Sequence, residues 1–160
     1  MLASASTNAA PAADPIGLTG LQRVRVHVDV ADREVAARVA AVADHLVAAL
    51  RRADPPIAVE AAAADALRVT VVVRPMSATE LRGFWLPLSG TYAVGAVRLD
   101  VERMVTLPAS PRPFPGVVWT TSRPVGVSWR AVGGEITRLL DAMVTELLEA
   151  RRALRAARGG

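Results

Sequence analysis

The sequence predicts an α+β fold: a single mixed, mainly antiparallel sheet of four to five strands, with two helices packed on one face. Three observations predict it. Several short segments alternate apolar and polar residues, as half-buried strands do. Two longer segments repeat apolar residues every three or four positions, as helices with one buried face do. Their order is β-α-β-β-β-α, and a chain of 160 residues is long enough for one hydrophobic core.

The first strand and the first helix are distinct in the N-terminal half. In Leu21–Val30 valines alternate with charged residues and a histidine, which predicts one buried and one exposed strand face. Asp32 is a suitable N-cap for a helix that ends at Asp54-Pro55-Pro56. Its apolar stripe consists of Val35, Val39, Val42, Leu46 and Leu50. A short strand is expected next, at Ile57–Glu60.

The middle of the chain predicts a strand and a long connection. Leu67–Arg74 alternates regularly, and Pro75 is expected to end this strand. Met76–Gly90 is then a long connection, which opens with the capping-box spacing of Ser77 and Glu80. Connections of this length are often functional.

Two further strands are predicted before the last helix. In Thr91–Leu107 the alternation changes at Arg103-Met104-Val105, which predicts a bulge or bend. Pro108–Pro115 is expected to form a proline-rich turn. Gly116–Trp129 is expected to be a strand interrupted at Pro124.

The last helix is predicted to follow Gly133-Gly134. It carries a strong apolar stripe, formed by Ile136, Leu139, Leu140, Met143, Val144, Leu147 and Leu148. The domain is therefore predicted to span residues 18–154, followed by a frayed basic tail at 155–160. Residues 1–17 are predicted to be a disordered leader. Because Ala3-Ser4-Ala5 has the small-x-small form of a cleavage site, a second interpretation is the remnant of an export segment.

Composition excludes several classes of function. The chain has no cysteine, so disulfides, thiolate metal ligands and thiol catalysis are excluded. All basic residues are arginine, which is typical of GC-rich genomes and is no sign of guanidinium chemistry. A net charge of +4 does not favour nucleic acid, which usually requires a dense basic stripe. No apolar run approaches the roughly 18 residues of a transmembrane helix.

The two histidines do not predict a catalytic site. His27 lies on the polar side of the first strand, and His45 lies on the first helix beside Asp44. Neither has a recognisable nucleophile or partner in the sequence, and no metal-ligand spacing is present. We therefore predict no catalytic residues, no metal site and no cofactor, and a protein that is not an enzyme.

The sheet face opposite the helices is the candidate binding surface. The residues assigned to binding are Arg25, Arg68, Arg98 and Tyr92 on this face, with Phe84 and Trp85 in the long connection. One interpretation of the arginines is a solvated face with cross-strand ion pairs. The other is a surface for a protein partner or an anionic ligand. Likewise, the aromatic loop either folds back over the sheet or anchors a partner.

The order of elements resembles that of small bacterial envelope proteins. The resemblance covers most of Leu18–Leu154 and extends to the lipopolysaccharide-assembly lipoprotein and the N-terminal domain of TolB-like proteins. It is one of layout and strand character, so no residue roles are carried over. This chain has no lipobox cysteine, in contrast to lipoproteins. The resemblance implies a non-catalytic envelope component that contacts another protein or an anionic lipid.

Three functions follow as hypotheses. The first is a non-enzymatic binding or assembly domain of the periplasm or cell envelope, with a protein partner and with anionic lipid as another ligand. The alternative is a cytoplasmic nucleic-acid-binding module that uses the arginine-bearing face; a cytoplasmic location follows if the N-terminus is native. The third is an enzyme whose site is not recognisable from sequence.

Overall fold

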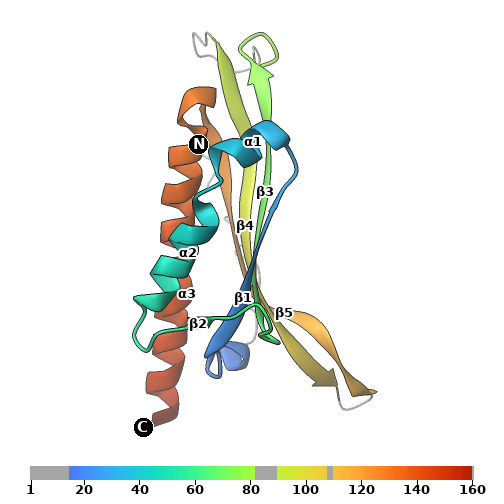
Figure 1. The fold of residues 1–160 in the computed structure, drawn as a ribbon, viewed down its shortest axis with the longest axis vertical. Helices are drawn as coiled ribbons and strands as arrows, with labels where there is room; N and C mark the ends of the chain where they lie inside the picture. The colour runs from blue at the N-terminus through green and yellow to red at the C-terminus, as the bar shows by residue number, and fades with distance from the viewer. Residues whose placement is uncertain (1–14, 82–89, 108–109, 160) are drawn as a thin grey trace, which may run out of the picture.

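One five-stranded sheet organises the computed structural model, which describes residues 15–81, 90–107 and 110–159 (Figure 1). The strands are β1 (Arg23–Val30), β2 (Ala58–Val59), β3 (Ala66–Ser77), β4 (Thr91–Leu107) and β5 (Ser110–Ser128). Their order across the sheet is β2-β1-β3-β4-β5. β1 is parallel to β2 and β3, whereas the β3–β4 and β4–β5 pairs are antiparallel. The predicted mixed, mainly antiparallel sheet is therefore confirmed.

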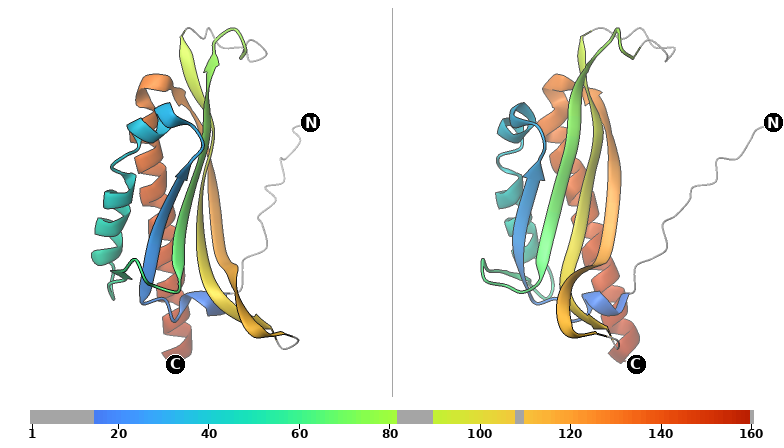
Figure 2. Two further views of the ribbon diagram at one scale, coloured as in Figure 1. Left: turned by 45° about the vertical axis from the view of Figure 1, so that its right-hand side comes forward. Right: turned by 90° about the vertical axis from the view of Figure 1, so that its right-hand side faces the viewer.

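The helices cover one face of this sheet. They are α1 (Arg33–Arg38), α2 (Val42–Arg51) and α3 (Val132–Gly159), with short 3₁₀ turns at Pro15–Leu18 and Trp129–Ala131. α2 contacts β1, and α3 contacts β4 and β5 (Figure 2). Within the described part of the chain, no helix has both the length and the apolar character needed to cross a membrane.

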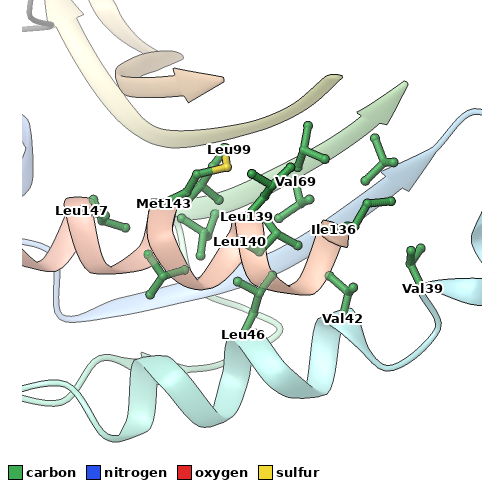
Figure 3. Packing of buried hydrophobic residues seen from close by; sticks show 14 of the residues in the cluster. Val39, Val42, Leu46, Val69, Leu99, Ile136, Leu139, Leu140, Met143 and Leu147 are labelled. Atoms are coloured by element: carbon green, nitrogen blue, oxygen red, sulfur yellow. The ribbon is translucent and has the colours of Figure 1, made fainter. Parts of the chain in front are cut away.

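The hydrophobic core lies between the helices and the sheet (Figure 3). The predicted stripe of the last helix is buried from Ile136 to Leu147, and Val69 and Leu99 face it from the sheet. The helix positions expected in the core are all buried, namely Val39, Val42, Leu46, Leu139, Met143 and Leu147. Each fully buried Val or Leu side chain contributes about 1.5–3 kcal/mol, so this interface is the main source of stability.

The first helix differs from the prediction because it is divided in two. Asp32 caps α1 as expected, accepting hydrogen bonds from the backbone N–H groups of Glu34 and Val35 at 2.8 and 3.1 Å. The chain then leaves helical geometry at Val39, before α2 begins at Val42. The periodicity continues across the break because both valines remain buried. The break lets α1 and α2 pack in different directions, which a stripe of apolar residues does not reveal (Figure 1).

A close approach of α1 to α3 explains the glycine at the start of the last helix. A Cβ atom on Gly133 would lie 2.7 Å from the backbone oxygen of Arg38, which is too close for any other residue without movement of α1. The same junction is held by Trp129, whose indole N–H donates to Glu34 at 3.1 Å. The guanidinium of Arg38 lies 5.3 Å from the centre of the Trp129 ring, within cation–π range.

Prolines do not interrupt the strands where the sequence predicted. β3 continues through Pro75 to Ser77, because β1 pairs with β3 only as far as Val71 and no N–H donor is needed on that side. β5 runs unbroken through Pro124 and begins within the expected proline-rich turn. β5 tolerates its prolines because it is an edge strand, paired only with β4. The irregularity predicted near Arg103 is present, as register shifts after Val101 and after Val105.

Two local predictions at the ends of elements have opposite outcomes. The capping box is confirmed: the Ser77 N–H donates to the Glu80 carboxylate at 2.6 Å, and the Glu80 N–H donates to Ser77 Oγ at 3.3 Å. These bonds lower the pKa of Glu80, with the backbone bond from Ser77 as the largest cause. By contrast, the arginine-rich composition of residues 151–158 predicts a solvated helix end, but Arg151 is only 2% exposed.

Candidate functional site

The open face of the sheet is the side that no described helix covers (Figure 2). Alternation places every second residue of β1, β3 and β4 on this face, because valines and leucines on the other side of these strands form the core. The strands thus bring Arg25, Arg68, Arg98 and Tyr92 to one face, as the sequence predicted. Phe84 and Trp85 lie outside the described residues, so their place relative to this face stays a prediction.

Arg68 is the centre of an ion-pair network on the open face. Its Nε donates to Glu102 at 2.8 Å, and its Nη1 donates to Asp29 at 3.0 Å. The hydrogen bond that Arg68 donates to Glu102 is the largest cause that raises the pKa of Arg68 above its ordinary value. The side chain thus links β1, β3 and β4 across the sheet.

The other two arginines of the candidate site also have partners. Arg98 donates to Asp100 at 2.8 Å, and Asp100 is only 5% exposed. Arg25 donates to the backbone oxygen of Ala63 at 2.9 Å. Arg68 and Arg98 are therefore paired with carboxylates of the same face, whereas Arg25 is held by a backbone carbonyl and has no ion-pair partner among the described residues.

Tyr92 is distant from the arginines along the sheet. It lies six residues from Arg98 on β4, which corresponds to about 20 Å of strand. Its neighbours in the register are Met76 on β3 and Ser128 on β5. The four predicted site residues that the structure describes therefore do not form one cluster: the arginines lie over the middle and the β1 side of the sheet, and Tyr92 lies near the start of β4.

Between these two parts lies an apolar hollow of about 440 Å³. It opens where β1 has ended and β3 continues beside β4, since β3 has 12 residues and β1 has only 8. Val72 is the most exposed large apolar residue of the described chain, at 58%. The hollow is lined by Ala31, Asp32, Val72, Val73, Arg74, Val94 and Gly95. Sequence reasoning did not identify the hollow, which results from the difference in length between β1 and β3.

A second exposed apolar group lies at the far end of the β4–β5 hairpin. Met104, Phe114 and Val117 are 45%, 40% and 48% exposed. Sequence reasoning did not identify this group, because the segment before Gly116 was predicted to be a turn rather than a strand paired with β4.

Of the two histidines, His45 has a side-chain partner in the structure. His27 is exposed on the open face. His45 on α2 contacts the carboxylate of Asp141 on α3, a partner that sequence spacing did not indicate. This pair bridges two helices at the surface, and the one hydroxyl bonded to either of the two residues in the described chain, that of Thr145, donates to the backbone oxygen of Asp141 and not to its carboxylate. Nor do any three acidic or histidine side chains of residues 15–81, 90–107 and 110–159 gather as a metal site.

Comparison with known proteins gives no relative. No protein-family model matches the chain, and no curated protein matches it. The function is therefore inferred from the site alone.

Proposed function

We propose that this chain is a non-enzymatic binding domain that contacts a protein partner through the open face of its sheet. The observation that carries the proposal is the combination of the apolar hollow at Val72 with a border of charged residues. Interfaces between proteins commonly have such an apolar centre with a polar rim. Val72 itself lies on β3, where the strand is paired with β4 at Ala96 and has passed the end of β1.

The state of the arginines supports a protein partner over an anionic one. Phosphate groups bind best to guanidinium groups that are free to donate paired hydrogen bonds. Arg68 already donates to Glu102 and Asp29, and Arg98 donates to Asp100. A phosphate would have to compete with carboxylates held 2.8–3.0 Å away. This weakens both the anionic-lipid hypothesis and the nucleic-acid alternative.

The compartment remains a prediction from the sequence. The layout that resembles that of envelope proteins favours the periplasm or cell envelope. Fractionation of cells that express the native gene with a C-terminal tag tests this. Recovery in the periplasmic or membrane fraction supports an envelope component, and recovery in the cytoplasm alone contradicts it.

The partner surface is tested by Val72→Glu, with Ser122→Glu as the matched control. Both positions are exposed on the open face, but Ser122 lies on β5, opposite Arg98 and away from the hollow. Immobilised variants are incubated with extract of the native cells, and captured proteins are quantified by mass spectrometry. We expect Val72→Glu to reduce capture of a specific partner at least tenfold, Ser122→Glu to retain it, and both melting temperatures to stay near that of the parent chain.

Equal capture by the parent chain and Val72→Glu would contradict the proposed surface.

Direct titration tests the anionic ligands, with single-stranded DNA, RNA and phosphatidylglycerol vesicles as probes. We expect no binding at physiological salt. Tight binding to DNA or RNA that weakens steeply with salt would favour the alternative function instead.

A further inference from the structure

The open face changes in composition along the strands. Beyond the end of β1, β3 and β4 continue side by side (Figure 2), and the register aligns their residues with β5 in three rows. We call these rows the Arg74 patch, which consists of Val72, Ala96 and Pro124; Arg74, Val94 and Gly126; and Met76, Tyr92 and Ser128. None of the nine residues is buried, and Arg74 is the only charged residue among them.

The Arg74 patch is mainly apolar, in contrast to the ion-pair network around Arg68. At its centre is the hollow of about 440 Å³, which is lined by Val72, Arg74 and Val94 among others. Gly126 leaves open space beside Val94, because a Cβ atom on this glycine would meet nothing within 4 Å. A partner that fills the hollow therefore covers Arg74 in the same contact.

Arg74 has no acid of its own in the part of the chain that the structure describes. Its side chain forms no hydrogen bond or ion pair there. Asp32 lines the same hollow, but its carboxylate caps α1. Glu80 is bonded to the N–H and hydroxyl groups of Ser77, and these bonds lower its pKa more than the charge of Arg74 does.

Covering a lone guanidinium with an apolar surface opposes binding. A charge that loses its water must gain a hydrogen-bonded counter-charge, or its desolvation is not offset. A carboxylate on the partner supplies this counter-charge, because a guanidinium donates two parallel hydrogen bonds to it. Arginine and tyrosine within an apolar contact are also typical of the residues that dominate the binding energy of interfaces.

We propose that the protein partner binds the Arg74 patch through a segment that carries one carboxylate beside a large apolar side chain; this chemistry rests on the proposed function of the open face. The apolar side chain fills the hollow at Val72, and the carboxylate accepts hydrogen bonds from Arg74. A nucleic acid does not fit this patch, since phosphate backbones are bound by several cations together and the patch has one.

The partner chemistry is tested with a phage library of random heptapeptides, selected on the immobilised parent chain and counter-selected on Val72→Glu. We expect enriched peptides to carry Asp or Glu next to Leu, Ile, Phe or Trp. The dissociation constants of synthetic copies are then measured by isothermal titration calorimetry. Arg74→Gln should raise the dissociation constant at least tenfold, because it leaves the carboxylate of the peptide without its counter-charge.

The matched control is Arg152→Gln, which removes the same charge from an exposed position near the C-terminal end of α3, far from the patch (Figure 1). The dissociation constant of this variant should equal that of the parent chain. Both variants should melt near the parent temperature, because neither arginine has a hydrogen bond or ion pair with a described residue.

Charge reversal separates a direct contact from an indirect effect of Arg74. Arg74→Glu should abolish binding of the acidic peptide. The same peptide with its acid changed to arginine should bind Arg74→Glu and not the parent chain, a rescue that a merely structural role of Arg74 would not produce. Retained binding of the acidic peptide by Arg74→Glu would overturn the proposal.

Two further results separate this contact from the function on which it rests. Peptides that need Val72 but bind Arg74→Gln as tightly as the parent chain would overturn the carboxylate contact and leave the proposed surface intact. A selection in which no peptide prefers the parent chain to Val72→Glu would contradict both. RNA binding that is lost in Arg74→Gln would also overturn the proposal, because it would assign Arg74 to a nucleic acid.

Discussion

Both faces of the sheet arise from the same alternation of residues along the strands, but one forms the core and the other meets solvent. On the covered face, valines and leucines of the strands pack against α2 and α3, and this burial carries the stability of the domain. On the open face, arginines and carboxylates satisfy one another in water, as Arg68 does with Asp29 and Glu102. Residues of the open face can therefore be changed at little cost in the free energy of unfolding, which is what a binding surface requires.

The largest test of this difference is a truncation on each face. Leu140 on α3 is 1% exposed, so Leu140→Ala should lower the free energy of unfolding by about 2–5 kcal/mol. Val72→Ala on the open face should change it by less than about 1 kcal/mol, because Val72 is 58% exposed. Urea denaturation followed by circular dichroism measures both. Similar losses for the two variants would show that the open face is covered after all.

A second test uses neighbouring arginines on α3. Arg151 is 2% exposed and donates to the backbone oxygen of Pro55 at 2.7 Å, whereas Arg152 is exposed. Burial, and secondarily the charge of Arg155, lowers the pKa of Arg151. Arg151→Ala should cost about 1.5–3 kcal/mol, the usual value of a hydrogen bond to a charged group.

The matched variant Arg152→Ala removes the same charge and should cost less than about 0.5 kcal/mol. Chemical denaturation of both variants at one salt concentration makes the comparison. If the two losses are equal, Arg151 acts only through its charge, and its burial has no energetic role.

The smallest effect is expected for the ion pairs of the open face. Arg68→Gln should cost less than about 1 kcal/mol, because both of its ion pairs are partly solvated. The loss should shrink further in 1 M NaCl, where exposed charges are screened. Arg33→Gln, at an exposed position on α1, is the control for a change of net charge. A salt-independent loss of several kcal/mol would mean that the network is structural.

The covered face could be predicted from the sequence because burial follows the spacing of apolar residues along each strand and helix. Every second residue of β3 and every third or fourth residue of α3 is apolar, and these residues are buried. The spacing of apolar residues does not show where a helix axis changes direction or which strands pair with one another. The break at Val39 keeps the apolar stripe intact while the helix axis changes. Pro75 and Pro124 are tolerated because no strand needs their missing N–H, and this depends on where neighbouring strands end.

The candidate site could be predicted less well. Alternation correctly assigned Arg25, Arg68 and Arg98 to one face, but it gave no information on which acid each arginine contacts. The hollow at Val72 results from unequal strand lengths, and the His45 contact with Asp141 joins residues that are 96 positions apart in sequence. The burial of Arg151 follows from its position, four residues after Leu147 on the apolar stripe, and not from its residue type.

The prolines of β5 determine how far such a sheet can grow. Pro111, Pro113, Pro115 and Pro124 all lie on this edge strand, and each lacks the amide hydrogen that a new neighbour would need. The β5 edge therefore offers no continuous row of backbone donors to a further strand, so edge-to-edge growth of the sheet is blocked on this side.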